Sequence, residues 1–184
     1  ETETPQGIIA LAKLPDQVKE WPNPHQYLGF VLNGIQDPGN VGTIIRTAWG
    51  AGIRDIFISD GTADPYSGKA VRASQGGIFH LHVHMQSVEE VIRWANLKNV
   101  TLWVGDPKAD RIYFSQDLTV PSLFVLGAEA HGPDPQLIKA GIPIKIPLSS
   151  GMDSLNVSIS SGILVFEALR QRWISSFSAN ALFP

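Results

Sequence analysis

The sequence of 184 residues contains no cysteine. This absence excludes disulfide bonds and thiolate metal sites, and it fits a protein of the reducing cytoplasm, which is where we expect this chain. Long apolar runs are missing too, since none approaches the roughly 18 residues that span a bilayer. The opening ETETPQG is acidic and polar, whereas a signal peptide needs a basic and then an apolar stretch.

Positive charge is scarce as well. The chain has 14 Lys and Arg against 17 Asp and Glu, so its net charge is −3 and its isoelectric point is near 5.9. Phosphate contacts need clustered Lys and Arg, and this balance therefore counts against a nucleic-acid binder. Hydrophobic residues make up 43% of the chain, as in a globular protein. We expect a linker with a short strand (Gly7–Leu14) over residues 1–23, and one domain over 24–184.

Short apolar runs alternate with helical patterns along the domain. This alternation predicts an α/β fold with a mainly parallel sheet flanked by helices. The strands are expected at Tyr27–Leu32, Arg54–Ser59, Ile78–Val83, Val100–Val104, Leu123–Leu126 and Ile142–Ile146. The helices are expected at about Val41–Gly50, Lys69–Ser74, Val88–Leu97 and Gln136–Ala140, with a last helix after Ser154. Asn40 and Ser87 are suited to cap the first and third helices, because their side chains accept from free helical N–H groups.

Three loops that follow apolar strands combine glycine with polar side chains. They contain Asn40, Gly42 and Arg46; Gly127, Glu129 and Gly132; and Pro147 followed by Ser154–Ser158. Glycine lets the backbone approach a ligand closely, because it lacks a Cβ atom. Taken separately, each loop also fits an ordinary turn next to a capped helix.

Together and in this order, the three loops resemble the motifs of the SpoU family, RNA ribose 2′-O-methyltransferases of the SPOUT superfamily, over roughly Tyr27 to Arg172. The resemblance implies a C-terminal deep trefoil knot whose loops hold S-adenosylmethionine, and a homodimer that pairs across the site. It implies methyl transfer to a ribose 2′-OH of ribosomal or transfer RNA, without a metal. Family members often carry a separate N-terminal RNA-binding domain. We expect one to precede ETETPQG, which would account for the low positive charge.

The same resemblance implies roles for individual residues. The catalytic residues would be Arg46, Glu129, Asn156, Asn40 and Ser154. The methyl donor would contact Leu126, Gly127, Gly132, Ile146, Leu148 and Leu155. Leu148 departs from the methionine of many members, a change that conserves volume. Ser154 and Asn156 are equally suited to cap the last helix.

Arg46 would be the key catalytic residue in this family. An arginine is a poor general base, because its guanidinium stays protonated in proteins. A physically easier role is to hold the adjacent RNA phosphate bidentately and to stabilise negative charge that grows on the 2′-oxygen. Lys69 and Arg72 lie in the one basic stretch near a loop and are candidate contacts to RNA phosphate. Solvated surface side chains are the alternative for all three.

Two other features have several interpretations. His80, His82 and His84 alternate, so on a strand they would share one face. We do not expect a metal there, because no carboxylate or cysteine accompanies them. The apolar end, Trp173–Pro184, could be a frayed tail, a flap on the core or part of a dimer contact.

Three other functions compete with ribose methylation. Related SPOUT enzymes methylate guanine N1, but the pattern of Asn40, Gly42 and Arg46 favours ribose. A cofactor-binding RNA module without catalysis would not need Arg46, Glu129 and Asn156 together. A Rossmann protein would need Gly-x-Gly-x-x-Gly after its first strand, and Gly39 and Gly42 do not have that spacing.

Overall fold

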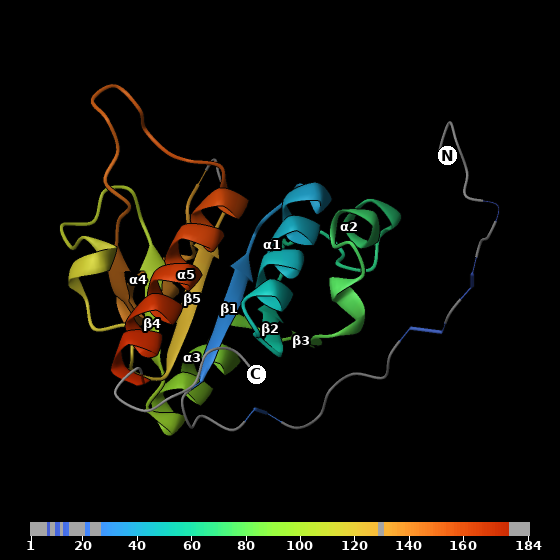
Figure 1. Ribbon diagram of the computed structural model, residues 1–184, viewed down its shortest axis with the longest axis horizontal. Helices are drawn as coiled ribbons and strands as arrows, with labels where there is room; N and C mark the ends of the chain where they lie inside the picture. Colours follow the sequence, from blue (N-terminus) through green and yellow to red (C-terminus); the bar gives the residue numbers. More distant parts are fainter. Residues whose placement is uncertain are drawn as a thin grey trace.

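A parallel sheet forms the centre of the computed structural model (Figure 1). The structure describes residues 7, 10–11, 13–14, 21–22, 27–128 and 131–176. Within them the strands are β1 (Leu28–Asn33), β2 (Asp55–Ile58), β3 (His82–Met85), β4 (Thr101–Gly105), β5 (Ser122–Gly127) and β6 (Ile142–Ile144). Their order is β3-β2-β1-β5-β4-β6, and every neighbouring pair is parallel. The predicted α/β fold with a mainly parallel sheet is confirmed.

Helices cover both faces of the sheet. On one face α1 (Pro38–Gly50) lies beside α5 (Val157–Ser176), and α2 (Gly68–Ala73) lies on the other side of α1 (Figure 1). The opposite face is covered by α3 (Val88–Lys98) and α4 (Pro135–Ala140). Two short 3₁₀ turns, η1 (Gly77–Phe79) and η2 (Tyr113–Ser115), complete the described part of the chain.

Alternating side chains of each strand fill two separate cores. Phe30 and Leu32 of β1 pack on the side of α1 and α5, whereas Val31 packs on the side of α3 and α4. The alternation follows from the two-residue period of a strand. Because both faces are covered, the central strands are continuous apolar runs, and the sequence pattern located them for this reason.

The start of α3 confirms the predicted cap at Ser87. The Ser87 hydroxyl accepts from the Glu90 backbone N–H, and the Glu90 carboxylate accepts from the Ser87 backbone N–H. This reciprocal pair is a capping box, which satisfies two donors that a helix start leaves open. Val91, Trp94 and Ala95 are buried on the inner side of the helix.

The prediction of a strand at Ile78–Val83 is wrong. Gln75 and Gly76 have φ angles of 49° and 88°, so the chain turns sharply into η1 before β3 begins at His82. Ile78 is buried in the α1 core instead of pairing in the sheet. His80 therefore lies outside the strand and does not share the face of His82 and His84.

His82 and His84 do have a carboxylate partner, which corrects the expectation that none accompanies them. Asp55 Oδ1 lies 3.3 Å from His82 Nδ1 and 2.8 Å from His84 Nε2. The contact forms because β2 and β3 run parallel with Asp55 opposite His82. Within the described residues, no three His, Cys, Asp or Glu side chains form a group that could hold a metal ion.

The ends of the chain are described only in part. Of the strand predicted at Gly7–Leu14, the described residues belong to no strand, and the others lie outside the described residues, as do most of residues 1–23 and all of 177–184. Among the helices that the structure describes, none combines the length and the apolar character that crossing a bilayer requires.

Candidate functional site

The loops that contain the three sequence motifs leave the sheet at the same edge. Parallel strands end at a common edge, and open α/β sheets bind their ligands there. The first loop follows β1, the second follows β5 and the third follows β6. Asn33 and Gly127, the last residues of β1 and β5, lie opposite each other in the sheet register.

The chain folds back tightly after β5. A Cβ atom on Gly127 would lie 2.2 Å from the backbone nitrogen of Pro133, so only glycine fits at this position. Gly132 has a φ angle of 71°, and its N–H donates to the Ala128 carbonyl at 2.8 Å. Gly127 and Gly132 thus shape a narrow turn. Glu129, the predicted catalytic residue between them, lies outside the described residues.

Asn33 holds this turn in place, and the sequence analysis missed it. Its side chain is buried, with Nδ2 donating to Ser59 Oγ at 2.8 Å and Oδ1 accepting from the Asp134 backbone N–H at 2.7 Å. One amide therefore connects the ends of β1 and β2 to the start of α4. A polar residue that ends an apolar strand was the only local signal.

Asn40 has a different role from the predicted cap. Asp37 caps α1, because its carboxylate accepts from the Asn40 N–H and Pro38 occupies the first helical position. The helix begins earlier than expected, and Asn40 lies in its first turn. The Asn40 Oδ1 atom accepts a hydrogen bond of 3.0 Å from Asn156 Nδ2.

Asn156 joins the first motif to the third. While its Nδ2 donates to Asn40, its Oδ1 accepts from the backbone N–H groups of Ser158 at 2.9 Å and Ile159 at 3.4 Å. Asn156 is therefore the cap of α5. Ser154, the other candidate for the cap, is exposed and lies outside the first turn.

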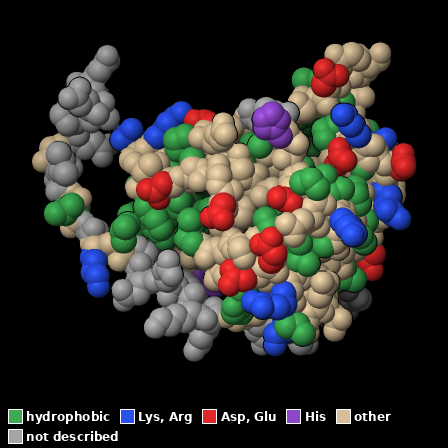
Figure 2. Space-filling view, turned by 180° about the vertical axis from the view of Figure 1, so that it is seen from behind, with side chains coloured by type: hydrophobic (Ala, Val, Ile, Leu, Met, Phe, Trp, Pro, Cys, Tyr) green, Lys and Arg blue, Asp and Glu red, His purple; other side chains and the backbone are tan. Residues whose placement is uncertain are grey.

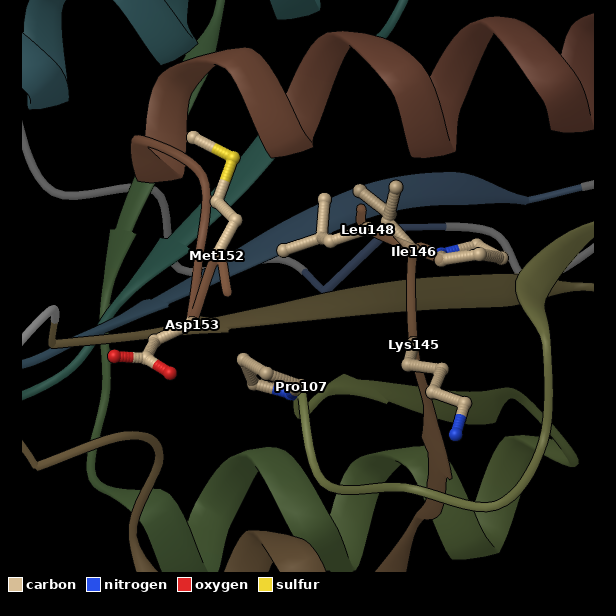
Figure 3. A pocket seen from close by; sticks show the side chains of 7 residues that line it. Pro107, Lys145, Ile146, Leu148, Met152 and Asp153 are labelled. Carbon is tan, nitrogen blue, oxygen red and sulfur yellow. The ribbon is translucent and has the colours of Figure 1, made fainter. Parts of the chain in front are cut away.

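A pocket of about 340 Å³ lies at the carboxyl ends of β4 and β6 (Figure 3). Met152 and Asp153 lie on one side of it and Lys145 and Ile146 on the other. It is lined by Pro107, Lys145, Ile146, Pro147, Leu148, Met152 and Asp153. Ile146 and Leu148 are two of the predicted donor contacts, whereas Leu126, Gly127, Gly132 and Leu155 lie outside this lining. The strand before the pocket ends at Ile144, two residues earlier than predicted.

The predicted RNA contacts lie on α1 and α2. Arg46 and Arg72 are exposed. Lys69 forms an ion pair with Asp37, and its hydrogen bond is the main reason why the pKa of Asp37 is lowered. The two helices touch closely, since a Cβ atom on Gly42 would lie 2.3 Å from the Ala70 carbonyl oxygen. The ion pair and this contact place Lys69 near the start of α1.

Comparison with known sequences gives relatives along most of the chain. Residues 27–166 match the model of the SpoU rRNA Methylase family. The 23S rRNA guanosine 2′-O-methyltransferase RlmP of Bacillus subtilis is 32% identical over 167 residues, which cover 90% of this chain and 66% of RlmP. An uncharacterized tRNA/rRNA methyltransferase of Synechocystis is 34% identical over 177 residues, covering 95% of this chain and 64% of the relative.

Solved structures with the same fold include two AdoMet-bound methyltransferases. The SpoU methyltransferase AviRb from Streptomyces viridochromogenes, in complex with AdoMet, superposes with a TM-score of 0.77 at 29% identity, covering 81% of this chain and 62% of AviRb. An AdoMet-bound rRNA methyltransferase from Sinorhizobium meliloti gives 0.75 at 35% identity, covering 78% and 56%. The chain spans between 56% and 66% of the length of these relatives. The match over residues 27–166 shows that the chain belongs to the SpoU rRNA methylase family.

Proposed function

We propose that this chain transfers a methyl group from S-adenosylmethionine to a ribose 2′-OH of RNA, either ribosomal or transfer RNA. The hydrogen bond between Asn40 and Asn156 is the observation that carries the proposal. It connects the helix that bears Arg46 to the loop that leaves the wall of the pocket. The named function of RlmP, a 2′-O-methyltransferase of 23S rRNA, supports the same reaction.

The pocket fits the methyl donor in size and chemistry. Its volume of about 340 Å³ lies within the usual range for small-molecule sites. Ile146, Leu148 and Met152 supply apolar surface. The Asp153 carboxylate and the Lys145 ammonium give the lining one charge of each sign, which suits a donor that carries both a carboxylate and cationic groups. When bound, S-adenosylmethionine supplies a methyl group already activated on a sulfonium ion. The narrow turn at Gly127 and Gly132, together with Leu126 and Leu155, supplies the remaining proposed contacts.

Arg46 acts on the RNA in this proposal. It is exposed and lies six residues after Asn40, about 9 Å further along the axis of α1. Its guanidinium holds a phosphate next to the target nucleotide and stabilises the negative charge that develops on the 2′-oxygen. Asn40 and Asn156 orient the start of α1, and Glu129 receives the proton through water. Ser154, Lys69 and Arg72 contact the RNA next to these residues.

Two copies of the chain form the active enzyme in this proposal. The outer side of α5 exposes Ile159, Phe166 and Trp173, with 56%, 46% and 37% of their surfaces accessible. They are seven residues apart, so they lie along one side of the helix. An apolar stripe of this length is typical of a surface that pairs with another chain. The trefoil knot that the resemblance implies stays a prediction.

Analysis of the methylated product tests the proposed reaction. The protein is incubated with ribosomal RNA and S-adenosylmethionine labelled in its methyl group, and the RNA is then digested to nucleosides. The expected product is a 2′-O-methylnucleoside. A methylated guanine base would contradict the ribose assignment. Absence of any product, with donor binding intact, would contradict catalysis on that RNA.

Replacing Arg46 with Lys tests its role separately. Lysine keeps the charge but loses the planar fork that holds phosphate bidentately. The Arg46→Lys variant is expected to bind the donor normally and to lose at least about ten-fold in kcat. Full kcat in this variant would show that bidentate geometry is irrelevant.

A further inference from the structure

The end of α1 displays an aromatic stack on the protein surface. The rings of Trp49 and His80 have centroids 4.3 Å apart and lie within 3° of parallel. Trp49 keeps 42% of its surface accessible, and Phe79, which precedes His80 in the chain, keeps 76%. Exposed aromatic faces that cluster in this way commonly mark a binding surface.

This stack lies on the side of α1 that faces away from α5. Gly42, Arg46 and Trp49 are spaced at four and three residues, so they share one side of the helix. On that side Gly42 touches Ala70 of α2, and Gly77 of η1 lies against the backbone of Arg46. The side toward α5 is marked by Thr47, which lies near Gly162. The stack is thus separate from the apolar stripe of α5.

The same elements carry the charge that a polyanion needs. Together α1, α2 and η1 contain three cations, Arg46, Lys69 and Arg72, and no Asp or Glu. On the opposite face α3 begins with Glu89 and Glu90, and Figure 2 shows acidic side chains across the middle of that face. Lys69 is paired with Asp37 at the far end of α1, so Arg46, one turn before Trp49, is the cation that the structure places next to the stack. In a chain with a net charge of −3, this cation beside exposed aromatic side chains favours RNA over an apolar protein partner.

We propose that the Trp49–His80 stack, with Phe79, receives an unpaired base of the RNA substrate. This inference rests on the proposed function and specifies the form of its substrate, single-stranded around the target. Bases in a duplex are already stacked, whereas unpaired bases stack on aromatic side chains without regard to sequence. Trp49 is about 4.5 Å along the helix from Arg46. The stacked base therefore belongs to a nucleotide close to the one whose phosphate Arg46 holds.

Fluorescence polarisation with three short labelled RNAs tests the proposal: a single strand of mixed sequence, the same strand with abasic sites, and its duplex. The wild-type chain is expected to prefer the single strand to the other two. Trp49→Ala is expected to weaken binding of the single strand about ten-fold, the usual effect of one lost stacking contact. Its binding of the abasic strand should not change. Trp49→Phe, which keeps an aromatic face, should retain most of the affinity.

Phe114→Ala provides the matched control, since Phe114 is an exposed aromatic residue of η2 with 52% of its surface accessible. It should bind all three RNAs like the wild type. Equal affinity of wild type and Trp49→Ala for the single strand would overturn the proposal, as would a wild-type preference for duplex or no binding at all. A Trp49→Ala chain that loses its dimeric mass would also overturn it, because the stack would then be a protein interface. Calorimetry with S-adenosylmethionine on the same samples distinguishes the two proposals. Donor binding without the expected RNA binding would overturn only the role of the stack, whereas loss of donor binding would contradict the proposed function.

Discussion

At the scale of single residues, Asn156 combines two tasks in one side chain. Its oxygen caps α5, and its nitrogen donates to Asn40 at the start of α1. The cap is local, and a sequence pattern can suggest it. The bond to Asn40 spans 116 positions and becomes visible only in three dimensions.

Substitution of Asn156 can separate these two tasks. Serine caps helices about as well as asparagine, but its short side chain cannot reach Asn40. Asn156→Ser is therefore expected to keep the wild-type free energy of unfolding in urea and to lose most of kcat. Asn156→Ala should lose both activity and about 1 kcal/mol of stability. If Asn156→Ser had full activity, the bond to Asn40 would have no part in catalysis.

Tyr27 is a second residue whose side chain is expected to affect stability, in this case at alkaline pH. Its hydroxyl is buried and has no hydrogen-bond partner among the described residues. Burial raises the pKa of Tyr27 well above its ordinary value, and the charge of Asp55 adds to this. Because the pKa of Tyr27 is higher in the folded than in the unfolded state, its neutral hydroxyl favours folding fully at pH values below the unfolded pKa of about 10. This contribution to the free energy of unfolding is lost as the pH rises above that value.

Tyr27→Phe removes this ionisation together with an unsatisfied polar group. The variant is expected to unfold at a higher alkaline pH than the wild type. At neutral pH its free energy of unfolding should be equal or higher by about 1 kcal/mol. Urea denaturation at neutral and alkaline pH measures both effects. A large loss of stability at neutral pH would mean that the hydroxyl has a partner in the folded protein.

At the scale of helices and strands, the sequence predicted features that depend on neighbouring residues. It did not predict features that depend on contacts between distant parts of the chain. The Ser87 cap depends on residues three positions apart, and the sequence predicted it. The cap of α1 is Asp37, three residues before the cap that the sequence pattern predicted at Asn40. The apolar residues Ile78–Val83 suggested a strand, but the turn at Gly76 and the burial of Ile78 against α1 displaced it to His82.

The resemblance of the three motifs pointed to Asn40, Arg46, Ile146, Leu148 and Asn156 as site residues, but it did not predict the contacts among them. Asn33 was missed because both of its partners, Ser59 and Asp134, are distant in the chain. Asp55 was missed as the partner of two histidines for the same reason, since only the register of β2 and β3 brings them together.

The close contact between α1 and α2 allows us to predict how a substitution between them changes the stability of the protein. Gly42→Ala would place a methyl group 2.3 Å from the Ala70 carbonyl oxygen, so the helices must separate. The expected loss is about 1–3 kcal/mol in the free energy of unfolding. Gly50→Ala is the matched control on the same helix, because no atom lies within 4 Å of its new methyl group. Equal stability of the two variants would show that α2 can move away from α1 without a loss in the free energy of unfolding.

At the scale of the whole molecule, the proposed dimer rests on the exposed stripe of α5. Phe166→Glu would place a charge in the middle of that stripe, and a buried unpaired charge opposes association. We expect the wild type to have the mass of two chains in light scattering and the variant to have the mass of one. Leu97→Glu is the control, because Leu97 is 74% exposed on α3 at the other face. A monomeric wild type would contradict the dimer.

The features of the candidate site gather in one part of the molecule. The carboxyl edge of the sheet carries the pocket, the narrow turn after β5 and the link between Asn40 and Asn156. The cations of α1 and α2 extend from this edge toward the aromatic stack. The proposed binding of a methyl donor and of RNA rests on these features at one end and one side of the molecule.

Titration with S-adenosylmethionine in a calorimeter tests whether the pocket after β6 holds the methyl donor. We expect saturable binding of one donor per chain. Leu148→Lys should abolish it, because a second cation beside Lys145 would replace apolar surface of the pocket and oppose the positive charge of the donor. Leu97→Lys, on the opposite face, should bind normally. A folded dimeric wild type that binds no donor, or a Leu148→Lys variant that binds like the wild type, would contradict the assignment of this pocket.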